Sequence, residues 1–257
     1  MGNVYNREFQ EMLIDHADKS ADRIIPFVYD LFTPNSVVDF GCGTGNFLAT
    51  VKKYSNNKCE VLGLDGNYIE KDLLQINFEK EFMSVDLTAT IALEHKYEMA
   101  FSLEVGEHLD EKYADIFVDS ITRASDIVLF SAALPGQYGV HHVNERYISY
   151  WIEKFSDRQY QCFDIMRPHF WWDHDIDLDY RQNMMIFVKQ NADGVNEALV
   201  GKLRSLETHI YDIAHPEFLE ARTKAWRYWM DKVEQFETRH KWLAVLLKIV
   251  WRKFKNI

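Results

Sequence analysis

The stretch Val37–Phe47, VVDFGCGTGNF, decides the fold because an apolar run leads directly into a loop with three glycines in five residues. The alternating glycines Gly41, Gly43 and Gly45 permit backbone angles that other residues avoid, and they let another group approach the main chain closely. Such a loop sits at the carboxyl end of a strand, where open α/β sheets bind ligands. Two interpretations fit: a structural turn that packs helix on strand, and a ligand-binding loop.

The spacing of the glycines narrows the kind of ligand. The dinucleotide fingerprint G-x-G-x-x-G requires glycine at its sixth position. Counting from Gly41, the sixth residue is Asn46, so the loop is G-x-G-x-G, with the acidic Asp39 two positions before it. This pattern disfavours a pyrophosphate cradle.

The composition indicates a globular chain with a full core. Its 257 residues and 47% hydrophobic content suffice for one large domain, or for one domain with an appendage. No segment has the pattern of a signal peptide or the roughly 20 apolar residues of a membrane span, so the sequence predicts a cytoplasmic protein. Cys42, Cys59 and Cys162 lack paired spacing, which argues against a disulfide framework or a zinc knuckle.

Charge is distributed unevenly along the chain. The net charge is −11, but residues 240–257 contain five basic and no acidic residues, so residues 1–239, with 24 basic and 40 acidic residues, carry −16. An acidic body repels a phosphate backbone, which counts against nucleic acid as the main partner. The tail is amphipathic, and it predicts a helix that lies on an anionic membrane surface or packs on the acidic body or on another subunit.

Short apolar runs alternate with longer helical patterns, which predicts an α/β sheet. The last two runs follow each other without a helical pattern between them, so we expect them to form an antiparallel hairpin on an otherwise parallel sheet. We expect strands at 36–40, 59–65, 82–86, 97–103, 126–134, 159–166 and 182–189, and helices at 18–32, 110–124 and 144–156.

The motif Asp39–Gly45, DFGCGTG, resembles the first motif of class I S-adenosylmethionine-dependent methyltransferases, and later acidic residues fall where that family places them. The resemblance implies a Rossmann-like, mostly parallel seven-stranded sheet with a terminal antiparallel hairpin. It also implies S-adenosyl-L-methionine as the cofactor. Residues 1–190 would form the methyltransferase domain, and residues 191–257 a helical C-terminal extension.

The resemblance assigns the cofactor-binding residues. Asp65, which ends the second predicted strand, would accept hydrogen bonds from both ribose hydroxyls, because a carboxylate offers acceptors on two oxygens. Asp86 would contact the adenine amino group, and Asp39 would orient the glycine loop or meet the cofactor's ammonium group. The full implied set is Asp39, Gly41, Gly43, Gly45, Asp65, Asp86, Leu87 and Leu103.

One departure from the family concerns the adenine wall. Many relatives have a bulkier residue that packs on the adenine ring where this sequence has Gly66 and Asn67. The wall is then left to Tyr68 or Ile69, which follow directly.

The fourth predicted strand leads into LEVGEHL, residues 103–109, which contains an E-x-x-E-H arrangement. It resembles the strand-four motif of ubiquinone-pathway and small-RNA 2′-O-methyltransferases, where these residues ligate a divalent metal. The resemblance implies Mg²⁺ or Mn²⁺ held by Glu104, Glu107 and His108, with His142 or its neighbour His141 as the fourth ligand, a donor set that suits a hard or borderline cation. The alternative is structural, because the same residues can begin a helix and hold a loop.

The sequence also indicates which kind of group accepts the methyl group. No Asn/Asp-Pro-Pro-aromatic motif ends the fourth strand and no cysteine follows a proline, so methylation of DNA bases is disfavoured. His108, His141 and His142 are candidate general bases, since an unperturbed imidazole titrates near neutrality. We predict methyl transfer to a hydroxyl group of a small molecule or glycan. The alternatives are an RNA 2′-O-methyltransferase and a catalytically silent, cofactor-binding scaffold subunit.

Aromatic residues are dense after the fifth predicted strand, in the part of the fold that usually caps the substrate. They are interpreted as core or as walls of the acceptor pocket. The group consists of Trp151, Phe170, Trp171, Trp172 and Tyr180.

Overall fold

A computed structural model gives the structure of the chain and describes residues 7–239 apart from 193–194, 196 and 209–210. The basic tail, residues 240–257, lies outside the described residues. The chain divides into two compact units, one up to Ile213 and one from Ala214 on. This boundary differs from the predicted one at residue 190, because helix α8 (Glu197–Leu206) buries its Leu203 in the core of the first unit.

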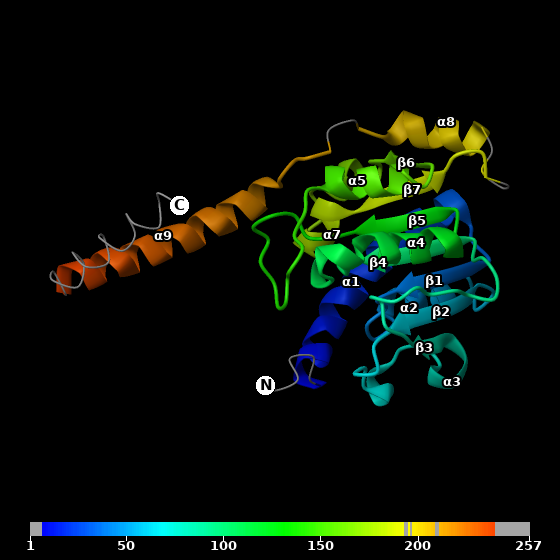
Figure 1. Cartoon of the computed structure of the whole chain (residues 1–257), viewed down its shortest axis with the longest axis horizontal. Coiled ribbons are helices and arrows are strands. Elements are labelled where there is room, and N and C mark those ends of the chain that lie inside the picture. The colour runs from blue at the N-terminus through cyan, green and yellow to red at the C-terminus, as the bar shows by residue number, and fades with distance from the viewer. Residues whose placement is uncertain (1–6, 193–194, 196, 209–210, 240–257) are drawn as a thin grey trace. The chain divides into compact units, whose positions relative to one another are not determined.

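The first unit is built on one seven-stranded sheet with helices on both faces (Figure 1). The strand order is β3-β2-β1-β4-β5-β7-β6; the first five strands run parallel, and β7 runs antiparallel to β5 and β6. The predicted sheet and its antiparallel end are confirmed. The strands are β1 (Ser36–Phe40), β2 (Glu60–Asp65), β3 (Phe82–Ser84), β4 (Met99–Leu103), β5 (Ile127–Ser131), β6 (Tyr160–Phe163) and β7 (Met185–Lys189).

The connection between the last two strands differs from the prediction. Two short helices, α6 (Met166–Phe170) and α7 (Leu178–Asn183), lie between β6 and β7, where the sequence pattern predicts none. Helices of five and six residues span less than two turns, so no helical period is visible in the sequence. The prediction of a direct hairpin connection is therefore wrong, although the antiparallel pairing is correct.

The predicted helices at 18–32, 110–124 and 144–156 are all present, and the first begins earlier, at Arg7. The longer helices of the first unit are α1 (Arg7–Phe32), α2 (Asn46–Tyr54), α4 (Ala114–Ala124), α5 (Ile148–Ser156) and α8. Shorter elements are η1 (Lys71–Leu73), α3 (Phe78–Glu81), η2 (Gly106–His108) and η3 (Glu111–Tyr113).

Each face of the sheet has its own core because successive side chains of a strand point to opposite sides. Val37 and Met99 pack in the core that α1, α2 and α8 cover, whereas Val38 and Ala100 pack in the core that α4 and α5 cover. The register pairs Val37 with Met99 and Val38 with Ala100, so it keeps both cores continuous across the sheet. The sheet is thus covered on both faces, except at the partly exposed edge strand β3.

The second unit contains one described helix, α9 (Pro216–Arg239), with five basic and five acidic residues. One face of α9 exposes large apolar side chains, Leu219, Trp226, Trp229, Met230 and Val233. Within the described residues, no helix combines the length and apolar character needed to cross a membrane.

Candidate active site

A cavity of about 810 Å³ lies at the carboxyl ends of the parallel strands. The loops after β1, β2, β3 and β4 form much of its wall. Residues at the start of α7 also line the cavity. Seven of the eight predicted cofactor residues line this cavity, namely Asp39, Gly41, Gly43, Asp65, Asp86, Leu87 and Leu103.

The three glycines of the loop are needed for two different reasons: two allow close packing, and one leaves space in the cavity. A Cβ atom at Gly41 would lie 2.4 Å from Val105 Cγ2, and one at Gly45 would lie 2.9 Å from Ile76 Cγ1. A Cβ at Gly43 would meet nothing within 4 Å, and Gly43 lines the cavity. Gly45, predicted to bind cofactor, is outside the described lining and is explained by packing, whereas Gly43 leaves space for a ligand.

Asp65 ties the glycine loop to the second strand. Its Oδ2 accepts a hydrogen bond from Gly43 N at 2.7 Å, and its Oδ1 accepts from Gly66 N at 2.6 Å and Tyr68 Oη at 2.5 Å. Burial raises the pKa of Asp65, and the three donors work against that rise. A carboxylate has about four lone-pair sites, so Asp65 retains capacity for a further donor from the cavity.

Tyr68 lies over Gly66, and this explains the departure noted in the sequence. A Cβ atom at Gly66 would lie 2.2 Å from Tyr68 Cε1, so only glycine leaves room for the ring. Tyr68 and Ile69 both line the cavity. Both residues are therefore available for the adenine wall, and their role in it stays a prediction.

Asp39 is a buried acid that lacks a protein partner for one oxygen. The residue is 4% exposed, it lines the cavity, and its Oδ1 has no hydrogen-bond partner in the described structure. Burial, followed by repulsion from Asp65, raises the pKa of Asp39 to about 7. Because buried polar atoms are normally satisfied, this oxygen indicates a ligand that donates a hydrogen bond or carries positive charge.

Glu104, predicted as a metal ligand, is held instead by two amide side chains. Its Oε2 accepts from Gln137 Nε2 at 2.9 Å, and its Oε1 accepts from Asn183 Nδ2 at 3.1 Å. Glu104 has a φ of 55°, a left-handed conformation that costs a non-glycine residue about 1–3 kcal/mol. The two amides hold the Glu104 carboxylate, and Glu104 is not part of the close group of possible metal ligands described next.

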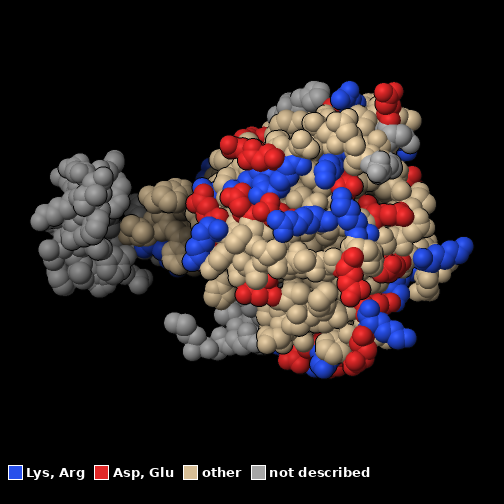
Figure 2. Space-filling view, turned by 45° about the vertical axis from the view of Figure 1, so that its right-hand side comes forward, with Lys and Arg blue, Asp and Glu red and all other residues tan. Residues whose placement is uncertain are grey.

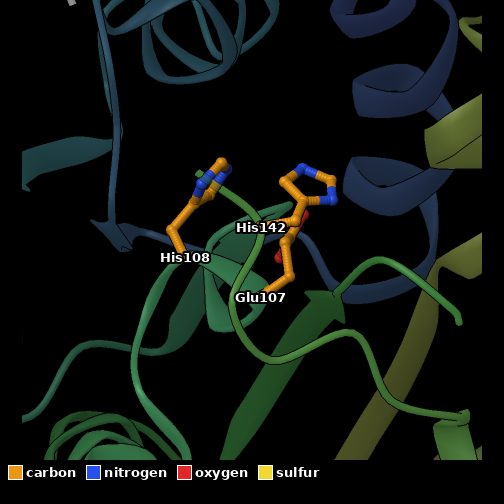
Figure 3. Close-up of side chains that lie close together, drawn as sticks. All are labelled: Glu107, His108 and His142. Carbon is orange, nitrogen blue, oxygen red and sulfur yellow. The ribbon is translucent and has the colours of Figure 1, made fainter. Parts of the chain in front are cut away.

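Three of the four predicted metal ligands come together (Figure 3). One ligand atom from each of Glu107, His108 and His142 lies within 4.8 Å of the others. The rings of the two histidines are 4.9 Å apart and nearly perpendicular. The Glu107 carbonyl oxygen accepts hydrogen bonds from Val143 N at 2.8 Å and Asn144 N at 3.0 Å, and these bonds hold the loop after β5 against the turn after β4.

The electrostatics of this group favour a bound cation. Glu107 is fully buried, and neither carboxylate oxygen has a hydrogen-bond partner in the described structure. Burial, followed by repulsion from Glu104, raises the pKa of Glu107 well above its usual range. Burial and then the neighbouring His142 lower the pKa of His108 to about 4, so His108 is neutral at pH 7 and offers a lone pair.

A carboxylate orients His142. His142 Nδ1 lies 3.0 Å from Glu145 Oε1, and an ionised carboxylate only accepts, so Nδ1 donates and Nε2 keeps its lone pair. His141, the other predicted histidine of this pair, is exposed, has a φ of 59° and lies outside both the cavity lining and the close group. The fold therefore selects His142 from the pair.

Two acids at the start of α7 belong to the cavity but were not predicted as site residues, whereas Tyr180 was predicted as core or pocket wall. Asp177, Asp179 and Tyr180 all line it. Tyr180 packs edge-on against Phe47, with ring centroids 5.3 Å apart, and burial raises its pKa. The available signal was the acidic run DHDID at residues 173–177, continued by Asp179, because carboxylates seldom lie in a core.

The chain matches known proteins in fold but not in sequence. No protein-family model and no curated protein sequence matches the chain. Solved structures match well in fold: the sugar N-methyltransferase KedS8 from Streptoalloteichus sp. has a TM-score of 0.56 at 11% identity, over 74% of this chain and 94% of that chain. The methyltransferase domain of bacterial CtHen1-C has a TM-score of 0.50 at 19% identity, over 67% of this chain and 98% of that chain.

An O-methyltransferase family protein from Burkholderia thailandensis has a TM-score of 0.54 at 11% identity, over 72% of this chain and 60% of that chain. At these identities the likeness establishes the architecture. The chain therefore has the Rossmann-like fold of class I S-adenosylmethionine-dependent methyltransferases, as the glycine loop indicated.

Proposed function

We propose that this chain is an S-adenosylmethionine-dependent methyltransferase that methylates a hydroxyl group of a small molecule or glycan. The observation that carries the proposal is the cavity in which Gly43, Asp39, Asp65 and Asp86 converge from the ends of three parallel strands. That edge is where open α/β sheets bind ligands. The fold, shared with O- and N-methyltransferases of known structure, supports it.

The residues fit the cofactor in charge and in hydrogen bonding. Asp65 retains acceptor capacity for a ribose hydroxyl, and Asp39 has an oxygen without a partner for an ammonium group. Asp86 uses Oδ1 to accept from Thr88 N at 2.9 Å and Thr88 Oγ1 at 2.6 Å, which leaves its other oxygen for an amino group. When bound, the cofactor supplies a methyl group on a positively charged sulfur.

The protein's contribution to the transfer is alignment and removal of a proton. Holding the methyl carbon and the acceptor oxygen about 3–3.5 Å apart is worth roughly 7–11 kcal/mol of barrier. His142, with Nδ1 fixed by Glu145, would take the hydroxyl proton on Nε2, a role that typically contributes ~10²–10⁴-fold. His108 is neutral at pH 7 and lies beside it.

We further propose that Glu107, His108 and His142 hold a divalent cation. Glu107 is buried without a partner for either oxygen, and both imidazoles lie next to it, so a cation would satisfy the group. One carboxylate with two imidazoles suits Mn²⁺ better than Mg²⁺, which prefers an all-oxygen shell. When bound, the cation supplies Lewis acidity toward a hydroxyl; without it, His142 acts as the general base.

The test is label transfer from methyl-labelled S-adenosylmethionine to fractionated small molecules, with S-adenosylhomocysteine measured in parallel. We expect labelled product and S-adenosylhomocysteine in equal amounts, and much less of both with an Asp65→Ala variant at a cofactor concentration below its Kd. Cofactor binding without S-adenosylhomocysteine formation in any fraction would instead support the scaffold function. Label on RNA with a strong salt dependence would support the RNA function.

A further inference from the structure

The loop that carries His142 is exposed along most of its length and buried at two points. In residues 136–147, between β5 and α5, the buried side chains are those of Gln137 and Asn144, each 2% exposed. The residues between these two are exposed or half-buried. A loop with so few buried side chains has no core of its own, so its position depends on what the two buried amides contact.

Both ends of this loop are tied to the E-x-x-E-H motif. At one end, Gln137 Nε2 donates to Glu104 Oε2 at 2.9 Å. At the other end, Val143 N and Asn144 N donate to the carbonyl oxygen of Glu107 at 2.8 and 3.0 Å. The second contact uses a backbone oxygen that any residue offers, whereas the first contact depends on the carboxylate of Glu104.

The side chain of Gln137 is bonded at both of its ends. Its Oε1 accepts from Leu134 N at 3.3 Å and from Asn183 Nδ2 at 3.0 Å. Asn183, a buried residue of α7, also donates to Glu104 Oε1 at 3.1 Å. The end of β4, the loop after β5 and α7 therefore meet in one group of hydrogen bonds, which we call the amide anchor and which consists of Glu104, Gln137 and Asn183.

The amide anchor differs from the ion pairs on the surface of the protein. Figure 2 shows Lys and Arg mixed with Asp and Glu over one face of the molecule, and exposed pairs such as Lys53 and Asp22, 3.0 Å apart, are of this kind. Exposed pairs contribute little and seldom fix a geometry. Glu104 is held instead by two buried, uncharged amides, and hydrogen bonds to a charged acceptor are stronger than those between neutral groups.

Gln137 lies between the two residues that hold the acidic partner of His142. Gly136 N and Tyr138 N donate to the Glu145 carboxylate at 2.7 and 2.6 Å, and Glu145 Oε1 lies 3.0 Å from His142 Nδ1. Fixing Gln137 thus fixes both backbone donors to Glu145, and Glu145 in turn fixes the His142 ring.

On the basis of the role proposed above for His142, we infer that Glu104 is a positioning residue, which through Gln137 fixes the loop that presents His142 to the cavity. Glu104 keeps a left-handed conformation, with a φ of 55°, and such strained residues cluster at functional sites. The two acids of the E-x-x-E-H motif then have different roles. Glu104 acts on His142 through the amide anchor, and Glu107 is left for the cation.

The first experiment needs neither cofactor nor cation. The imidazole nitrogens of the isotope-labelled full chain are observed by NMR at about pH 8.5, where an ordinary imidazole is neutral, and a His142→Gln variant identifies the His142 signals. In the wild type we expect two well-separated His142 signals, from a protonated Nδ1 and an unprotonated Nε2. In Gln137→Leu the two signals should move together, because a released ring exchanges between its tautomers.

The matched control for this variant is Gln161→Leu. Gln161 is half-buried on the edge strand β6, which contributes no residue to the described lining of the cavity. This variant should keep the wild-type His142 signals. Wild-type His142 signals in Gln137→Leu would overturn the inference.

The second experiment exchanges the carboxylate and the amide, and so separates positioning from a general loss of stability. Gln137→Glu alone sets two carboxylates against each other, so it should lose the wild-type His142 signals and weaken Mn²⁺ binding about tenfold. Adding Glu104→Gln restores one carboxylate and one amide, and it should restore both properties. A double variant no better than Gln137→Glu would overturn the inference. Restored His142 signals with Mn²⁺ binding still weak would also overturn it, because Glu104 would then be a ligand.

The third experiment measures turnover with an acceptor fraction that takes label from S-adenosylmethionine. Gln137→Leu should lower kcat about 10–100-fold and leave the cofactor affinity unchanged, as expected for a residue that acts through His142. A matching loss of cofactor affinity would indicate a disrupted cavity and count against the inference. If no fraction takes up label with the wild type, the methyltransferase function itself fails, and the first two experiments still decide the role of Glu104.

Discussion

His142 Nδ1 and Glu145 Oε1 lie 3.0 Å apart, and the Glu145 carboxylate also accepts hydrogen bonds from the backbone nitrogens of Gly136 at 2.7 Å and Tyr138 at 2.6 Å. One carboxylate thus both shapes the loop after β5 and fixes the tautomer of the histidine that this loop delivers. A histidine whose second nitrogen is fixed in this way is a better base or metal ligand than a free one.

The first prediction concerns this pair. Replacing Glu145 with Gln should lower turnover about 10–100-fold, the usual effect of losing a carboxylate that orients a ligating histidine. The cofactor affinity should stay the same because Glu145 is outside the cofactor loops. Steady-state kinetics and calorimetry check this, with Glu111→Gln, an exposed acid paired to Arg146, as the control. Equal turnover in the two variants would show that Glu145 only shapes the loop.

The second prediction concerns the cofactor. Replacing Asp65 with Ala removes the carboxylate that accepts from Gly43 N, and it should weaken S-adenosylmethionine binding at least about tenfold, since each charge-assisted hydrogen bond is worth roughly 1.5–3 kcal/mol. Calorimetry measures the affinity, and Asp72→Ala, an exposed acid paired to Arg7, is the control. Equal affinity in the Asp65 variant and wild type would refute the assignment.

The third prediction is a pH dependence of cofactor binding. Burial, then Asp65, raises the pKa of Asp39 to about 7, so much of the free protein carries a protonated Asp39 at neutral pH. A positively charged cofactor favours the ionised form, and its affinity should therefore rise from about pH 6 to pH 7.5 with release of a proton. Calorimetry in two buffers of different ionisation enthalpy measures that release.

The raised pKa of Asp39 has the opposite effect on the stability of the fold, which falls as the pH rises. Because the pKa of Asp39 is higher in the folded chain than its usual 3.8, its contribution to the free energy of unfolding is largest below about pH 4 and is lost as the pH rises through about 7. An Asp39→Asn variant should lack both this loss and the proton release. If the variant still releases the proton, another group is responsible.

The fourth prediction separates the two glutamates of the E-x-x-E-H motif. Mn²⁺ binding, measured by calorimetry or by the electron paramagnetic resonance of free Mn²⁺, should weaken at least about tenfold in Glu107→Gln. It should change little in Glu104→Gln, because Gln137 and Asn183 hold that carboxylate. Equal weakening would restore Glu104 as a ligand, and activity that survives exhaustive chelation would leave only the general-base role of His142.

The fifth prediction concerns α9, whose apolar face exposes Trp226 by 67% and Trp229 by 65%. We propose that this helix, together with the five basic residues of 240–257, binds anionic membrane surfaces. The full chain should co-sediment with vesicles rich in phosphatidylserine, and the double variant Trp226→Ala, Trp229→Ala should lose most of that binding. Tyr228→Ala, a change at an aromatic side chain that is 56% exposed on the opposite side of the helix, is the control.

Two results would contradict the membrane proposal. The first is a full chain that ignores anionic vesicles. The second is a dimer in sedimentation velocity that the double tryptophan variant dissociates, which would assign the face to a second subunit.

Much of the fold was predictable because it rests on local patterns. The run Val37–Phe40 followed by Gly41 identifies a buried strand and a glycine loop, and the later apolar runs supply the remaining strands in order. Strand type and order follow from apolar periodicity, which is a property of neighbouring residues. The short helices α6 and α7 escaped prediction because fewer than two turns leave no period to detect.

The sequence by itself determined the glycine loop, the acid that ends β2, the acid that follows β3, and the types of side chain available after β4. Only the tertiary structure decided which of them meet. It selects His142 over His141, holds Glu104 with Gln137 and Asn183, and brings Asp177 and Asp179 to the cavity. The reason is physical, because the loops that carry these residues are held by hydrogen bonds between residues far apart in the chain. One example is the bond from Val143 N to the Glu107 carbonyl oxygen. No spacing in the sequence predicts such a bond.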